Sequence, residues 1–195
     1  RRVRGGSTMP TTSDPARRKV DEGHLQLPFG TQALVLTPSL RSPLSFVPPD
    51  AFENMLVVST TRPPGKVEQL VRDRGGDPNT VGLVPVSGSP VDYDGPLWTT
   101  SVVHPNDLSG IYERFDRGMN HVKPGEGWVV FDNVNVLLMY AERSSVGNFI
   151  ESVAENVRRR NAAGAYALVR DAVTEDTYAD VAGVFDVERD RRDDD

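Results

Sequence analysis

The chain has 195 residues, 37% of them hydrophobic and 26% charged, which is enough for one domain with a full core and argues against general disorder. A formal net charge of −6 argues against a general nucleic-acid-binding surface. The sequence has no cysteine, which excludes disulfides and Cys-ligated metals, and no apolar run of the roughly 18 residues that a membrane-spanning helix needs.

Both ends of the chain differ in composition from its middle. Residues 1–26 contain few apolar residues, and residues 189–195 contain none. We therefore predict a disordered N-terminal tail over residues 1–26, one folded domain over residues 27–188 and a charged, disordered C-terminal tail over residues 189–195. The N-terminus lacks the apolar segment of a signal peptide, so we expect a cytoplasmic protein, and Met9 is a candidate for the true start.

The first half of the predicted domain alternates short apolar segments with loops. Four prolines within residues 38–49 exclude a long helix there. Pro63 and Pro64 are expected to open a helix, and Gly75 is expected to end it. Strands are predicted at residues 33–37, 55–60 and 81–86, and the last is followed by a polar, turn-rich loop over residues 87–97.

The second half continues this alternation. Asn106 or Asp107 is expected to cap a helix whose apolar positions repeat with helical spacing. Ser144 or Ser145 is expected to begin the helix with the clearest helical spacing, and Gly164 to end it. Strands are predicted at residues 99–103, 127–131, 165–169 and 184–187, the last at a sheet edge, and a further helix begins at residues 174–175. Strands that alternate with helices predict a three-layer α/β fold with a mainly parallel sheet and helices on both faces.

One of these strands ends in a carboxylate. Residues 127–131 form an unbroken apolar run that stops at Asp132 and Asn133. Such a run is typical of a strand that is buried on both faces of a parallel sheet. Open α/β folds bind their ligands at the carboxyl ends of the strands, so Asp132 is the first candidate for a binding residue. His104 also follows a predicted strand and could lie at the same edge.

The order of these pieces resembles the RecA/KaiC-like ATPase domain, a P-loop family, in a degenerate form like that of proteins from salt-loving archaea. The resemblance covers residues 27–188. Residues 129–132, four positions that end in aspartate, are similar to the Walker B motif, in which the aspartate holds magnesium through water. The resemblance implies that Asp132 is a vestigial magnesium residue, with Asn133 where the family often has serine. High arginine and aspartate content, with only three lysines among 22 basic residues and no cysteine, indicates a GC-rich genome and is consistent with a salt-adapted microbe.

The phosphate-binding loop of that family is missing from its expected place. The pattern G-x-x-x-x-G-K-[ST] binds phosphate through backbone N–H groups, the lysine and the hydroxyl. Residues 37–44 contain no glycine, and Pro43 and Leu44 stand at the lysine and hydroxyl positions. Residues 59–62, after the second strand, have no carboxylate to activate water. We therefore expect no ordinary ATP hydrolysis and no catalytic residue.

The leading hypothesis is a non-catalytic regulatory or signalling domain that binds a protein partner or itself and needs no cofactor. The first alternative is an atypical nucleotide-binding protein, with weak or no hydrolysis, in which Ser39, Arg41 and Asp132 hold ATP and magnesium. A second alternative is a DNA-linked regulator that uses the basic N-terminal arm, although the acidic net charge disfavours nucleic acid. The three histidines are too far apart in the sequence to show metal-ligand spacing.

Overall fold

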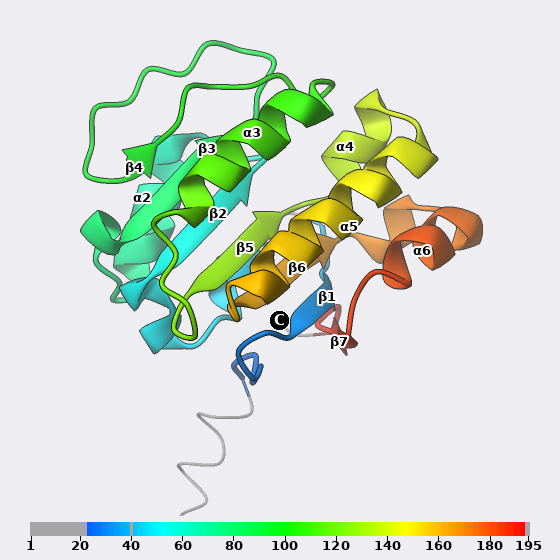
Figure 1. The fold of residues 1–195 in the computed structure, drawn as a ribbon, viewed down its shortest axis with the longest axis horizontal. Helices are drawn as coiled ribbons and strands as arrows, with labels where there is room; N and C mark the ends of the chain where they lie inside the picture. Colours follow the sequence, from blue (N-terminus) through cyan, green and yellow to red (C-terminus); the bar gives the residue numbers. More distant parts are fainter. Residues whose placement is uncertain (1–22, 40, 194–195) are drawn as a thin grey trace, which may run out of the picture.

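The computed structural model describes residues 23–39 and 41–193, and its centre is a parallel sheet with helices on both faces (Figure 1). The sheet has seven strands in the order β4-β3-β2-β5-β6-β1-β7, and every pairing is parallel. The strands are β1 (Gln32–Leu36), β2 (Met55–Ser59), β3 (Val81–Pro85), β4 (Trp98–Thr99), β5 (Trp128–Asp132), β6 (Ala163–Leu168) and β7 (Val187–Asp190). The predicted three-layer α/β fold is confirmed.

Two sets of helices cover the two faces of the sheet. One face packs against α3 (Leu108–Met119), α5 (Arg143–Arg159) and α6 (Glu175–Ala182), with α4 (Asn135–Tyr140) at their end (Figure 1). The other face is covered by α2 (Pro64–Asp73) and the 3-10 helices η1 (Pro43–Ser45) and η2 (Pro49–Glu53). Two further 3-10 helices are η3 (Pro78–Thr80) and η4 (Arg170–Ala172). No helix within the described ranges is long and apolar enough to cross a membrane.

β5 lies at the middle of the sheet, and all five of its residues are buried. Val129 and Phe131 face the core under α3 and α5, whereas Trp128 and Val130 face the core under α2 and η2. Both faces of the strand are therefore apolar, which is why its sequence shows no polar alternation. The predicted burial of this strand on both faces of a parallel sheet is confirmed.

Local capping explains where α3 begins and where α2 ends. Asp107 caps α3 with a carboxylate oxygen that accepts the Gly110 N–H at 2.9 Å. α2 ends at Gly75, whose φ of 77° lies in the left-handed region. The N–H groups of Gly75 and Gly76 bond the carbonyls of the last turn of α2, as in a Schellman motif. Both ends were predicted from the sequence.

The predicted ends of α5 are wrong. Its N-cap is Glu142, and Ser144 and Ser145 lie inside the first turn. Gly164 does not end the helix, because it is a residue of β6. Asn161 ends it instead, with a φ of 51°, a left-handed conformation that asparagine tolerates better than most residues.

Two predicted strands are also misplaced. Of the strand predicted at residues 99–103, only Thr99 lies in a strand, the two-residue β4, and Val103 makes a single bridge to Val86. The edge strand at residues 184–187 is in fact β7, Val187–Asp190, which pairs with β1. An edge strand is paired on one side only and is partly exposed, so it accepts charged residues that hide the apolar pattern of a strand.

Both tail boundaries require correction as well. Leu25, which we assigned to the N-terminal tail, is fully buried, and its N–H donates to the Phe46 carbonyl at 2.7 Å. Arg189 and Asp190, which we assigned to the C-terminal tail, belong to β7. The rest of the predicted N-terminal tail up to residue 22, with its basic arm and Met9, lies outside the described residues, as do residues 194–195.

Candidate functional site

The carboxyl ends of β2 and β5 form the candidate site. Ser59 is paired in register with Asp132 at the ends of these two neighbouring strands. The Thr60 hydroxyl donates to the carbonyl oxygens of Asp132, at 2.6 Å, and Asn133, at 2.9 Å. Asn133 has a φ of 72°, and its side-chain oxygen accepts the Asn135 N–H at 2.9 Å. These bonds fix the turn after β5 against the loop after β2.

An ion pair between Arg62 and Asp132 is the centre of this site. Arg62 Nη1 lies 2.6 Å from Asp132 Oδ2, and the side chains are 19% and 5% exposed. The Thr61 hydroxyl donates to the same carboxylate oxygen at 3.2 Å and accepts a bond from Arg62 Nη1 at 3.1 Å. The Ser59 hydroxyl donates to the Arg62 carbonyl at 2.7 Å, which holds the loop that carries the arginine. The side chains of Thr61, Arg62 and Asp132 therefore form a closed cluster in which Asp132 is buried, Arg62 is partly buried and Thr61 is exposed.

Burial and charge act in opposite directions on the Asp132 carboxyl group. Removal from water raises the pKa of Asp132, while the positive charge and hydrogen bond of Arg62 and the bond from Thr61 oppose that rise. The net direction is upward, because burial is the largest of these effects. The ionised form of Asp132 in the folded protein therefore depends on Arg62.

The residues at this edge do not fit a magnesium ion. Magnesium requires oxygen ligands in near-octahedral geometry and is usually held by one or two carboxylates. Here Oδ2 of the Asp132 carboxylate already contacts the Arg62 guanidinium at 2.6 Å, so a metal bound to this carboxylate would lie close to the positive charge of Arg62. Within the part of the chain that the structure describes, no three His, Asp or Glu side chains come together as a metal site.

The structure brings together two of the three residues predicted for the site. Arg41 and Asp132 line one cavity of about 290 Å³, together with Thr37, Thr61 and Arg62. Ser39 is exposed and does not line this cavity. His104 packs edge-on against the Tyr140 ring at 5.4 Å and is likewise not part of the cavity lining.

Sequence reasoning missed Arg62, the residue that pairs with Asp132. We examined residues 59–62 only for a carboxylate. Arg62 is a cation three positions after the end of a buried strand. This signal could have identified it as a partner of Asp132 only if β2 and β5 were known to be neighbours in the sheet.

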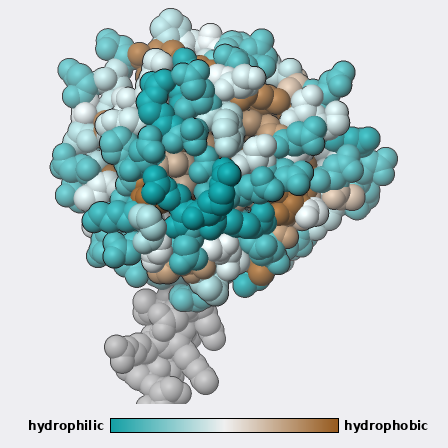
Figure 2. Space-filling view, in the orientation of Figure 1, coloured by the Kyte–Doolittle hydropathy of each residue, from teal (hydrophilic) through white to brown (hydrophobic). Residues whose placement is uncertain are grey.

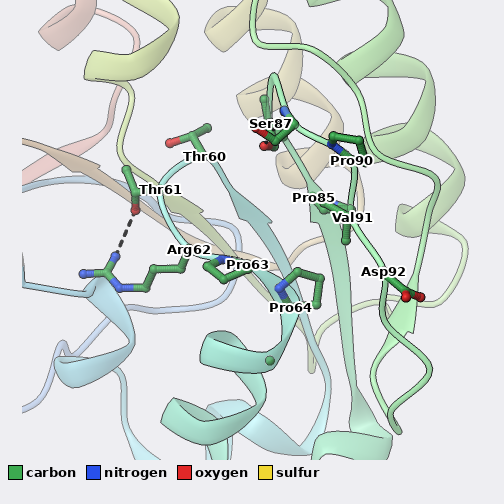
Figure 3. A pocket seen from close by; sticks show the side chains of 13 residues that line it. Thr60, Thr61, Arg62, Pro63, Pro64, Pro85, Ser87, Pro90, Val91 and Asp92 are labelled. Carbon is green, nitrogen blue, oxygen red and sulfur yellow. Dashed lines mark hydrogen bonds between the residues drawn. The ribbon is translucent and has the colours of Figure 1, made fainter.

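A second cavity, of about 380 Å³, lies on the other side of the loop after β2 (Figure 3). Its walls include Pro63 of the loop after β2, Pro64 at the start of α2, Pro85 at the end of β3 and Pro90 of the loop after β3. In Figure 3 the Arg62 side chain points away from Pro90 and toward the far side of its own loop. The arginine charge is therefore directed to the Asp132 side of the loop and not into this proline-walled cavity.

Comparison with known proteins identifies the family. Residues 45–188, most of the chain, match DUF7504, a family of unknown function, so the chain belongs to that family. The matched residues contain Arg62 and Asp132 and exclude β1 and Arg41. No curated protein matches the sequence.

Proposed function

We propose that this member of the DUF7504 family is a cytoplasmic, non-catalytic, RecA/KaiC-like regulatory or signalling domain that works through contacts with protein chains. The observation that carries the proposal is the 2.6 Å ion pair between Arg62 and Asp132. Asp132 ends the central strand at the edge where α/β folds bind ligands, yet its carboxylate is occupied by an arginine of the same chain. The carboxylate at this edge is therefore already neutralised by a cation, which disfavours a metal-bound nucleotide.

The segment after β1 supports the same proposal. Phosphate groups bind well where successive backbone N–H groups point outward at a helix N-terminus. Here η1 has three residues and begins at Pro43, which has no N–H, and the Leu44 N–H donates to the Ser42 hydroxyl at 3.2 Å. The described residues between β1 and β2 form 3-10 helices and no α-helix. This segment is poorly suited to bind a phosphate group.

Exposed apolar side chains favour a protein contact at the same edge of the sheet. Met139 and Tyr140, at the end of the helix that follows β5, are 77% and 52% exposed. By contrast, the face over α3, α5 and α6 is largely hydrophilic, with apolar residues in small separate areas (Figure 2). Neighbouring exposed apolar residues are typical of contact surfaces, so we expect a partner to approach over α4.

A second candidate function is nucleotide binding without hydrolysis. It is favoured by the cavity that Arg41 shares with Asp132, because a guanidinium binds phosphate oxygens in a bidentate manner. The cavity of about 290 Å³ is at the lower end of the usual size of ligand sites, and a phosphate there would have to attract Arg62 away from Asp132.

Thermal unfolding with and without ATP and magnesium separates these two functions. A ligand at a hundred times its dissociation constant stabilises the protein that it binds by about 2.7 kcal/mol, which raises the melting temperature by several degrees. We expect no rise for the wild-type chain. A clear rise that Asp132→Ala removes would establish nucleotide binding and refute the proposal.

The proposed contact with a protein partner is tested with a photo-crosslinking amino acid in place of Met139. The matched control has the same amino acid in place of Asn148, an exposed residue of α5. We expect a discrete cross-linked species from position 139 and none from position 148. A strict monomer by light scattering with no cross-linked species from position 139 would contradict the proposal.

A further inference from the structure

A groove on the α2 side of Arg62 concentrates positive charge. Its volume is about 480 Å³, and its lining includes Arg41, Arg62 and Lys66, with Pro63 and Leu70 as apolar walls. No carboxylate is among its lining residues. The whole chain has a net charge of −6, so a groove lined by three cations differs strongly in charge from the rest of the chain.

Arg41 is held at this groove by an aromatic ring. Its guanidinium lies 4.8 Å from the centroid of the Phe46 ring, and the ring is 1% exposed. The Arg191 guanidinium lies 5.9 Å from the same centroid, and the Arg191 N–H donates to the Leu36 carbonyl at 2.8 Å. The ends of β1 and β7 thus bring a fourth cation beside the groove.

Lys66 lies at an electrostatically unfavourable position of α2. It is exposed in the first turn of α2, where the positive end of the helix dipole disfavours a cation, and α2 has no acidic residue in that turn. Lys66 makes no ion pair with any residue in the described ranges. Its place in the groove lining is the role that the structure offers for it.

We propose that this groove binds an acidic segment of a protein partner, with carboxylates on Arg41 and Lys66 and an apolar side chain against Leu70 and Pro63. The inference rests on the proposed function, because it specifies the kind of chain that the domain contacts. The planar guanidinium of Arg41 suits a carboxylate, and the apolar walls suit a peptide side chain. A long nucleic acid would also meet the acidic remainder of the surface, which disfavours it.

The test uses fluorescence anisotropy with a labelled peptide of ~10 residues, in which aspartates and glutamates flank one leucine. The control peptide has asparagine in place of each aspartate and glutamine in place of each glutamate. We compare the wild-type chain with Lys66→Glu and with the double variant Lys66→Glu/Arg41→Gln. The matched control is Lys123→Glu, which makes the same charge change in the exposed turn before β5, at the opposite edge of the sheet.

We expect the acidic peptide to bind, the neutral peptide to bind far more weakly, Lys66→Glu to lower the affinity by about fivefold and the double variant by about tenfold or more. Lys123→Glu should leave the affinity within about twofold of wild type. Equal binding of both peptides, no loss in the Lys66 variants, or an equal loss in Lys123→Glu would overturn the inference. So would complete displacement of the peptide by a single-stranded oligonucleotide.

The two proposals fail in different ways. If the peptide does not bind but a cross-linked species forms from position 139, the acidic-segment inference is wrong and the proposed function stands. If ATP and magnesium raise the melting temperature, the proposed function is wrong whatever the peptide does.

Discussion

Replacement of Arg62 by methionine should destabilise the protein strongly near neutral pH. The change keeps much of the side-chain length and removes the charge, so the Asp132 carboxylate, whose side chain is 5% exposed, loses its counter-ion. Loss of one partner of a buried ion pair typically costs about 3–5 kcal/mol. Here Arg62 is 19% exposed and the Thr61 hydroxyl bond at 3.2 Å remains, so we expect about 2–4 kcal/mol.

The loss should depend on pH in a defined direction. Burial raises the pKa of Asp132 in the folded protein, and removal of Arg62 should raise it further because the guanidinium opposes that rise. A group whose pKa is higher when folded than when unfolded stabilises the fold at low pH and loses that contribution as the pH rises through the folded pKa. The deficit of Arg62→Met should therefore be small near the usual aspartate pKa of about 3.9 and reach its full size at neutral pH.

Urea unfolding of the wild-type chain, Arg62→Met and Arg62→Met/Asp132→Asn at both pH values measures this effect. The double variant has no buried charge, so it should recover to within about 1 kcal/mol of wild type at neutral pH. A deficit that is equal at the two pH values, or below about 0.5 kcal/mol at neutral pH, would refute the reasoning.

Three further predictions concern the stability of the fold. A Cβ atom at Gly118 of α3 would lie 2.9 Å from the Leu56 methyl groups, so Gly118→Ala should lower the free energy of unfolding by about 1–3 kcal/mol. A Cβ atom at Gly147 would have nothing within 4 Å, so Gly147→Ala should be neutral or stabilise the protein by up to about 1 kcal/mol. Urea unfolding compares the two variants. Asn161→Ala should lower stability by about 1 kcal/mol relative to Asn161→Gly, because only glycine adopts the left-handed φ of 51° without strain. Tyr93→Phe removes the hydroxyl bond of 2.6 Å to a carboxylate of α2, so amides of the loop between β3 and β4 should exchange hydrogen faster.

The fold could be predicted from the sequence because its signals are local. The apolar run that ends at Asp132 predicted a strand buried on both faces, and Asp107 predicted a helix start, since each feature depends only on neighbours in the chain. The predicted ends of α5 failed where two residue types compete for one role. Asn161, which precedes Gly164 in the chain, adopts the left-handed conformation that ends α5, and Glu142, which precedes the two serines, is its N-cap.

The centre of the site could not be predicted because it depends on strand order. Arg62 and Asp132 are 70 residues apart, and their contact exists only because β2 and β5 are adjacent in the sheet. Hydrophobic periodicity predicts strands but does not predict which of them are neighbours. The resemblance to a P-loop fold placed Arg41 and Asp132 at one site, and they do line one cavity, whereas Ser39, which the same resemblance placed there, is exposed and lies outside the cavity lining.

Amide NMR spectra recorded during a titration with ATP and magnesium test the central claim most directly, because they report on the ion-paired edge residue by residue. If Arg62 occupies the Asp132 carboxylate as the structure shows, the amide signals of Thr61, Arg62 and Asp132 should not shift in a saturable way at millimolar nucleotide. Saturable shifts that are concentrated at these residues, and that Asp132→Ala removes, would contradict the account.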